Sequence, residues 1–138
     1  MDFFFKPRGI ALIGATPNPQ KGGNAILRNL LKGFRGAIYP VNPRYETIEG
    51  VRCWPSVDGL PDPLDLAIVF VPAPHVPEII RRCAARGIHG VMIESSGFAE
   101  AGPQGAARQA ELAAIARETG IRLWGPNCMG LVDAHAGY

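Results

Sequence analysis

The sequence has no long hydrophobic run and no surplus of charge of one sign. Its longest apolar stretch, residues 66–73, is far shorter than the roughly 20 residues that cross a bilayer. The opening MDFFFKPRG turns from apolar to charged at once, so it does not predict a signal peptide. A formal net charge of +2 creates no basic field that would attract nucleic acid. These absences argue against membrane and nucleic-acid partners.

Cysteine is also scarce. The three cysteines, Cys53, Cys83 and Cys128, are odd in number and form no CxxC pair. This pattern argues against a disulfide framework and favours a reducing compartment, so we expect a cytoplasmic protein. The histidines are scattered, and no group of Cys, His, Asp and Glu has the spacing of metal ligands.

Three signatures of nucleotide binding or acyl hydrolysis are missing, namely GxGxxG, GxxxxGK[ST] and GxSxG. What the chain does have is a globular composition, with 138 residues of which 47% are hydrophobic and 19% charged. That length suits one domain with one substantial core. The 17 glycines and 13 prolines fall between apolar runs and are interpreted as turn residues.

Apolar runs and amphipathic stretches alternate along the chain. Short continuous apolar runs predict buried parallel strands at residues 10–16, 36–42, 64–72, 89–96 and 121–127. Helical periodicity predicts helices at residues 23–33, 75–87 and 103–120. A glycine ends each of these helices, and a proline stands at or near the start of the second and the third. The stretch 46–63 is expected to be a long connection with a small strand at 51–54.

This alternation predicts an α/β fold. We expect a Rossmann-like, doubly wound parallel sheet with five main strands in the order 3-2-1-4-5 and helices on both faces. In such a sheet the ligand lies outside the carboxyl ends of the strands, where the strand order reverses. The five strand ends are therefore the candidate site.

The first strand end continues as GATPNPQKGGN. Gly14 permits a tight turn, and Gly22 and Gly23 lie where the next helix begins, so backbone N–H groups can approach a phosphate. Thr16 and Lys21 add a hydroxyl and an ammonium group. We interpret the stretch as a pyrophosphate-binding loop, with an ordinary β–α turn as the alternative.

Asn42, Pro43 and Arg44 follow the second strand. A dinucleotide-binding domain usually has an acidic residue here, which holds a ribose diol. An arginine would instead bind a phosphorylated ribose in a bidentate manner. The position therefore favours NADP or coenzyme A, and the residues alone do not separate these two ligands. A solvated surface arginine is the alternative.

The third strand end carries an apolar shelf made of Val71, Pro72, Ala73 and Pro74. Its prolines delay the next helix, and an extended apolar surface suits a long, thin ligand arm. His75 is more typical of a helix start than of a catalytic base.

The fourth strand end offers hydroxyl and backbone donors in a turn, from Ser95, Ser96 and Gly97. Turn chemistry alone would also explain these residues. Glu94 is expected to anchor the turn and not to act in acid–base chemistry. After the fifth strand, Asn127 can tie neighbouring loops together. Cys128 is interpreted as structural, because no His or Asp partner is apparent in the sequence.

Four stretches carry a family resemblance in order along nearly the whole chain: residues 10–57, DLAIVFVPAPHV, GVMIESSGFAEAG and GIRLWGPNCMG. The chain resembles the N-terminal CoA-binding domain of the NDP-forming acyl-CoA synthetases. These include ADP-forming acetyl-CoA synthetase and, more distantly, the alpha subunit of succinyl-CoA synthetase. The pair SSGFAE and GPNCMG is the more specific part of the match.

The resemblance implies that residues 1–138 form a CoA-binding domain, the N-terminal part of a longer chain. In that family acyl-CoA and phosphate give an acyl phosphate, whose phosphate passes to a histidine and then to a nucleoside diphosphate. The phosphohistidine and ATP-grasp parts would lie in later domains or in a separate subunit, and His135 does not match the phosphohistidine context. The chain alone is thus expected to bind CoA without turnover, and its oligomeric state is left open.

The resemblance also implies roles for individual residues. The stretch that contacts the CoA phosphates is matched by Gly14, Ala15, Thr16 and Pro17. Arg44 falls where succinyl-CoA relatives have a basic residue on the CoA nucleotide. The shelf along the pantetheine arm is matched by Pro72, Ala73 and Pro74, and the turn near the thiol by Ser95, Ser96 and Gly97. Ser95 and Ser96 replace Thr-Glu of the succinyl relatives, so the acyl group is not indicated.

Two alternatives stay open. One is a free-standing, non-catalytic CoA-binding module. The other is an NADP-binding oxidoreductase domain, which would explain Arg44 but neither the missing GxGxxG nor the GPNC turn.

Overall fold

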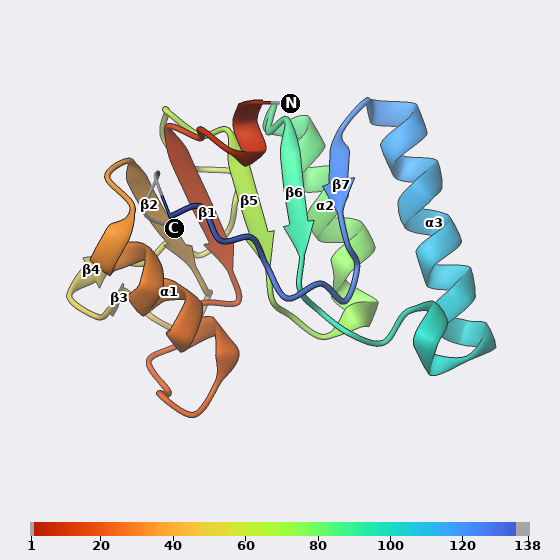
Figure 1. Cartoon of the computed structure of the whole chain (residues 1–138), viewed down its shortest axis with the longest axis horizontal. Helices are drawn as coiled ribbons and strands as arrows, with labels where there is room; N and C mark the ends of the chain where they lie inside the picture. The colour runs from red at the N-terminus through yellow and green to blue at the C-terminus, as the bar shows by residue number, and fades with distance from the viewer. Residues whose placement is uncertain (1, 135–138) are drawn as a thin grey trace.

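A parallel five-stranded sheet forms the centre of the molecule (Figure 1). The computed structural model describes residues 2–134. In spatial order the strands are β2 (Ala37–Val41), β1 (Gly9–Ile13), β5 (Leu66–Val69), β6 (Gly90–Ile93) and β7 (Arg122–Trp124). All five strands predicted from the sequence are present, and the predicted α/β, Rossmann-like class is confirmed.

The predicted strand order 3-2-1-4-5 is wrong in the place of one strand. β5, the third strand of the prediction, pairs with β1 and does not lie outside β2. In the numbering of the prediction, the order is 2-1-3-4-5. The physical reason is burial, because β1 and β5 are buried at every position and need neighbours on both sides. β2 contains Pro40, which cannot donate to a ladder, and it lies at the edge of the sheet.

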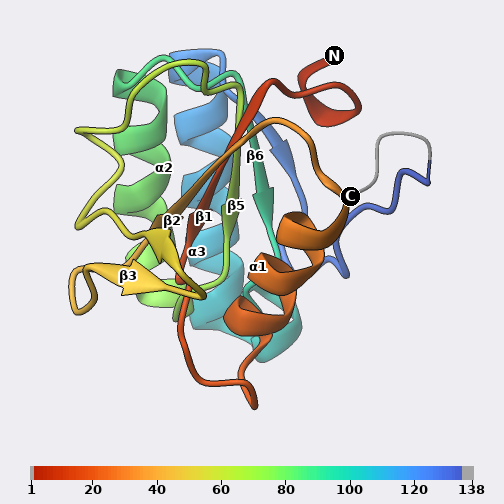
Figure 2. The same cartoon turned by 90° about the vertical axis from the view of Figure 1, so that its left-hand side faces the viewer.

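The helices cover both faces of the sheet, as predicted (Figure 2). Helix α1 (Gly22–Gly33) lies on one face, and α2 (Val76–Ala85) and α3 (Pro103–Thr119) lie on the other. From β1 the chain passes through α1 to β2, which lies on one side of β1. The later strands β5, β6 and β7 are added in succession on the other side of β1. Strand order therefore reverses between β1 and β5, which is where such a sheet opens a crevice for a ligand.

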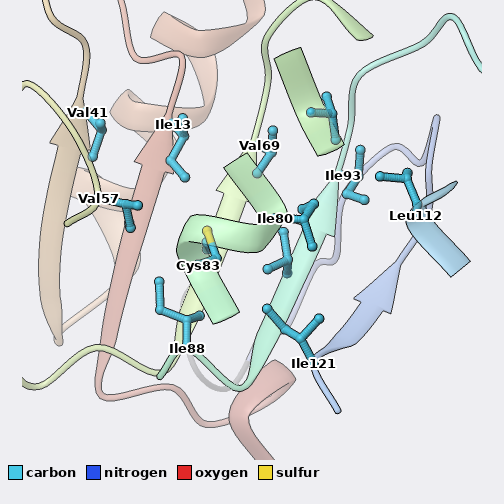
Figure 3. Close-up of a cluster of buried hydrophobic side chains, with 14 of the residues drawn as sticks. Ile13, Val41, Val57, Val69, Ile80, Cys83, Ile88, Ile93, Leu112 and Ile121 are labelled. Atoms are coloured by element: carbon cyan, nitrogen blue, oxygen red, sulfur yellow. The ribbon is translucent and has the colours of Figure 1, made fainter. Parts of the chain in front are cut away.

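Two hydrophobic cores fill the layers. The core beneath α2 and α3 appears in Figure 3 and includes Ile13, Val69, Ile80, Cys83, Ile93 and Leu112. The core beneath α1 includes Leu12, Leu27, Leu30, Ile68 and Met92. Each buried aliphatic side chain contributes about 1.5–3 kcal/mol to folding, so the strand ends rest on a firmly packed base.

The connection between β2 and β5 holds a small hairpin of β3 (Thr47–Ile48) and β4 (Val51–Arg52). The predicted small strand at 51–54 is thus confirmed in its first half, and β3 is an additional partner. Trp54 lies beside β2, because its backbone N–H donates to the carbonyl of Pro40 at 2.9 Å. The carbonyl of Trp54 in turn accepts from the backbone N–H of Asn42 at 2.9 Å.

Short 3-10 turns complete the fold at Asp2–Phe4, Ala73–His75 and Ala99–Ala101. After β7, residues 125–134 cross the α1 face of the sheet (Figure 1). Cys128 and Leu131 pack there against the core beneath α1. His135 lies outside the described residues.

Candidate functional site

A cleft of about 540 Å³ lies at the carboxyl ends of the strands. Of the residues predicted from the strand ends, the cleft is lined by Gly14, Thr16, Lys21, Gly22, Gly23, Asn42, Arg44, Val71, Pro72, Ser95, Ser96 and Asn127. These follow β1, β2, β5, β6 and β7, so the fold gathers all five strand ends in one place. An adjoining cavity of about 440 Å³ shares part of this wall, including Asn42, Arg44 and Pro72.

The other predicted residues lie around the cleft and do not line it. Pro43 lines the adjoining cavity. Ala15 and Ala73 are buried and support the loops from behind. Pro17 and Pro74 are exposed in their loops, and Gly97 is half-buried.

Three further residues line the cleft that the sequence had not singled out as ligand contacts, namely Tyr45, Phe70 and Glu94. Each is the direct neighbour of a predicted residue at a strand end, and this adjacency is the signal that could have found them. Tyr45 and Phe70 are 38% and 37% exposed, which is high for aromatic rings in a chain with a packed core. Together they give the cleft two partly exposed aromatic faces.

The first loop turns tightly because it contains glycine where a side chain has no room. Gly14 has a φ of 98°, and a side chain there would collide with the carbonyl of Phe70. A side chain at Gly23 would collide with the carbonyl of Gly14. Helix α1 therefore begins in direct contact with the loop that leaves β1.

Two buried or half-buried amides fix the path of this loop. Asn42 Nδ2 donates to the carbonyl of Ala15 at 2.8 Å, and Asn42 Oδ1 accepts from the N–H of Arg44 at 3.0 Å. Asn24 Nδ2 donates both to the carbonyl of Thr16 at 2.9 Å and to Glu49 Oε1 at 2.8 Å. One asparagine thus anchors the loop to β2, and the other anchors it to the β3–β4 turn.

The start of helix α1 is electropositive. Lys21 is the residue that precedes the helix, its side chain makes no capping hydrogen bond, and the first turn contains no acidic residue. The helix dipole and the backbone N–H groups at Gly22 and Gly23 favour an anion at this point. Arg44 adds a second cationic side chain to the same cleft, and it forms no ion pair with the residues described between 2 and 134.

Most hydrogen-bonding groups at the fourth strand end already have partners within the protein. Ser95 is buried, and its Oγ accepts from the N–H of Val71 at 3.0 Å while lying 3.4 Å from the carbonyl of Val69. The N–H of Gly97 donates to Glu100 Oε1 at 2.6 Å. Ser95 therefore joins the ends of β5 and β6, and Ser96 is the exposed hydroxyl of this turn.

Three side chains near the strand ends are of types that carry acid–base or nucleophilic chemistry, namely Cys128, His75 and Glu94. Burial raises the pKa of the Cys128 thiol, whose Sγ lies 3.3 Å from the carbonyl of Ile93, and a raised pKa disfavours the reactive thiolate. His75 is exposed and borders the adjoining cavity. Burial also raises the pKa of Glu94, which lines the cleft. The cleft thus combines cationic groups near β1 and β2 with an apolar wall at Val71 and Pro72.

Residues 2–134 contain neither a metal-ligand cluster nor a helix that could span a membrane. No group of three or more His, Cys, Asp or Glu side chains gathers there in a way that would hold a metal ion. None of the helices described is long and apolar enough to span a bilayer.

Comparison with protein families and curated proteins gives consistent matches. A family model described as a CoA binding domain matches residues 8–134. The alpha subunit of acetate–CoA ligase [ADP-forming] II from Pyrococcus furiosus is 43% identical over 136 residues, which are 99% of this chain and 30% of that protein. Acetate–CoA ligase [ADP-forming] I from Archaeoglobus fulgidus is 43% identical over 133 residues, 96% of this chain and 19% of that protein.

A solved structure of a further synthetase is also similar to this chain. The dinucleotide-forming acetyl-coenzyme A synthetase 1 of Ca. Korarchaeum cryptofilum, in complex with phosphate and ADP, superimposes with a TM-score of 0.92 at 38% identity. The match covers 98% of this chain and 29% of that one. The chain therefore spans between about a fifth and a third of the length of these relatives.

Proposed function

Because the chain belongs to the CoA-binding domain family, we propose that it binds coenzyme A in the cleft at the strand ends as part of an NDP-forming acyl-CoA synthetase. Coenzyme A is the ligand that both the family and the ligase relatives support. The alternative of an NADP-binding oxidoreductase domain has no support from the family matched or from these relatives.

The observation that carries this proposal is the charge of the cleft near β1 and β2. The start of α1, Lys21 and Arg44 supply backbone donors, an ammonium group and a guanidinium group along one wall. Coenzyme A carries a pyrophosphate and a 3′-phosphate at its nucleotide end, so it needs two anion sites in neighbouring positions. The pyrophosphate would bind at Gly22 and Gly23, with Thr16 as a further donor.

Arg44 would bind the 3′-phosphate. Asn42 holds the backbone of Arg44 through a 3.0 Å hydrogen bond, and the guanidinium group has no carboxylate partner among residues 2–134 that would compete with a ligand. A guanidinium group matches a phosphate in a bidentate manner. This arrangement supports recognition of a phosphorylated ribose.

The remaining strand ends would hold the rest of the molecule. The pantetheine arm would run along Val71 and Pro72, with Ala73 and Pro74 as the support of that shelf. Its thiol end would reach Ser96 and Asn127, which lie after β6 and β7. Ser95 would act indirectly, because its hydroxyl holds Val71 in place.

The full reaction would need more protein than this chain supplies. In the proposed assembly, acyl-CoA and phosphate exchange to an acyl phosphate and CoA, and the phosphate then passes through a histidine to a nucleoside diphosphate. The histidine and the nucleotide site would belong to further ligase domains or to a separate ATP-grasp subunit, since the chain spans less than a third of the relatives. We further propose a cytoplasmic location, which the free cysteines Cys53, Cys83 and Cys128 support.

Calorimetric titration of the 138-residue chain with CoA, dephospho-CoA and NADPH tests the proposal. CoA should bind more tightly than dephospho-CoA, and NADPH should bind weakly or not at all. Binding of NADPH without CoA would overturn the proposal, and equal binding of CoA and dephospho-CoA would remove the role of Arg44. A coupled assay for acyl phosphate with the chain alone should show no turnover.

A further inference from the structure

Glu94 stands at the junction of two cavities. It follows β6 and lines the ligand cleft together with Ser95 and Ser96. It also lines a smaller cavity of about 180 Å³ beneath residues 129–132. Among the cavities described for residues 2–134, Glu94 is the one residue common to these two.

The Glu94 carboxylate has no counter-charge nearby. It takes part in none of the ion pairs found among residues 2–134. Burial alone raises its pKa, and no neighbouring cation offsets that effect. The groups around the smaller cavity are uncharged, including Ile26 and Asn29 of α1, Ile68 of β5 and Leu131 of the final segment. The Cys128 thiol is a titratable neighbour of Glu94, and its pKa is itself raised, mainly by burial.

The cleft is consequently polarised along its length. Its cations, Lys21 and Arg44, follow β1 and β2, whereas the carboxylate of Glu94 follows β6, on the far side of β5. Coenzyme A has its phosphates at one end and its thiol or thioester at the other. The charges of the cleft thus favour one orientation, with the acyl end toward Glu94.

We propose that Glu94 is a specificity-determining residue, which admits uncharged acyl groups at the thiol end of the cleft and disfavours acyl groups that carry a second carboxylate. This inference rests on the proposed binding of CoA in this cleft. A terminal carboxylate on the acyl group would meet the Glu94 carboxylate in a half-buried place without a cation to balance either charge. An uncharged acyl group has no such penalty. The mainly apolar cavity next to Glu94 offers it a place to bind.

Butyryl-CoA and succinyl-CoA form a matched pair for the test, because their acyl chains have nearly the same length and differ in the terminal charge. Isothermal titration of the chain at neutral pH should give at least about tenfold weaker binding for succinyl-CoA, because a like-charge contact is costly even where water screens it and costs more in a half-buried place. In Glu94→Gln the two ligands should bind within about twofold of one another. Glu94→Asp, which keeps the charge, should keep the discrimination.

Glu118→Gln is the matched control, because it removes one carboxylate from an exposed position on α3 and should leave the discrimination unchanged. Equal affinity of the wild-type chain for butyryl-CoA and succinyl-CoA would overturn the inference while leaving CoA binding intact. Discrimination that persists in Glu94→Gln would also overturn it. Failure of the wild-type chain to bind CoA itself would overturn the proposed function, so the two failures are distinguishable.

Discussion

Asn24 and Glu49 are joined by a hydrogen bond of 2.8 Å that connects helix α1 with the turn between β3 and β4. Asn24 is 1% exposed, and the same amide group donates to the carbonyl of Thr16 at 2.9 Å. Glu49 adopts a φ of 52°, an uncommon conformation for a residue other than glycine. One buried side chain therefore holds the first loop of the cleft and the hairpin in a fixed relation.

Replacement of Asn24 should reduce both stability and ligand binding. We expect Asn24→Ala to lower the free energy of unfolding by about 1–3 kcal/mol, because it leaves the half-buried carbonyl of Thr16 without its donor. CoA affinity should fall as well, since the loop loses its anchor. Urea unfolding and calorimetric titration measure these two effects. Asn29→Ala, at an exposed position of the same helix, is the control and should change stability by no more than about 0.5 kcal/mol.

Arg44→Ala should weaken CoA binding by roughly 1.5–3 kcal/mol, the range of a charge-assisted hydrogen bond. Dephospho-CoA, which lacks the 3′-phosphate, should lose little affinity. Arg35→Ala removes the same charge from an exposed loop residue and controls for the net charge of the chain. Equal losses for CoA and dephospho-CoA in titrations of Arg44→Ala would show that this side chain does not recognise the 3′-phosphate.

Gly23→Ala should destabilise the fold, because the new methyl group would collide with the carbonyl of Gly14. Overpacking of this kind typically costs about 1–3 kcal/mol, and here it should also displace the start of α1, the proposed anion site. Gly59→Ala is the matched control, since a methyl group there has no neighbour within 4 Å. Chemical denaturation of both variants, followed by CoA titration, should separate them clearly. Similar unfolding midpoints would contradict the close contact between α1 and the loop.

The pairing of Arg8 with Asp65 should make stability depend on pH in the acid range. Arg8 donates to both carboxylate oxygens of Asp65, at 3.0 Å from Nε and 2.7 Å from Nη2. The hydrogen bond from the Arg8 side chain is the main cause that holds the pKa of Asp65 below its usual value of 3.8, against the opposing effect of burial. Because the pKa is lower in the folded state, this contribution is complete above about pH 4 and is lost as the pH falls through the folded value.

Asp65→Asn should therefore be less stable than the wild type near pH 7, and the difference should shrink on acidification toward pH 3. Guanidinium unfolding at several pH values measures this. Asp58→Asn is the control, because Asp58 forms an exposed ion pair with Arg82 at 3.4 Å, and such pairs contribute little. A difference between Asp65→Asn and wild type that stays constant with pH would contradict the assignment.

Two features of the sequence indicate the observed strand order, and the predicted order did not take them into account. Pro40 lies within the second strand, and proline in a strand is typical of an edge. The third strand contains LAIV without an interruption, as expected for a strand buried on both faces. These two signals together favour 2-1-3-4-5 over 3-2-1-4-5, because only the former places the third strand inside the sheet.

The place of the cleft that forms the candidate site was predictable to a large extent, because parallel strands bring their carboxyl ends to one edge. The glycines of the first loop and Arg44 were recognisable from their place after a strand. Asn24 and Glu49 were not, because they lie 25 positions apart and meet only once the hairpin has folded over the loop. The hydrogen bonds that Ser95 and Gly97 form within the protein were not predictable either. In a sequence, the hydroxyl and N–H groups of a turn look the same whether they bind a ligand or another part of the chain.

The contact of Trp54 with β2 has a consequence for assembly. Pro40 offers no N–H, and its carbonyl and the N–H of Asn42 are both occupied by Trp54, at 2.9 Å each. The carboxyl half of β2 is thus closed to any incoming strand, as natural sheets often protect their edges. On the opposite side of the sheet, β7 pairs with β6 and has no second strand beside it among residues 2–134. If another copy of this domain joins the sheet by strand addition, the pairing will be between the two β7 strands and will close after two copies.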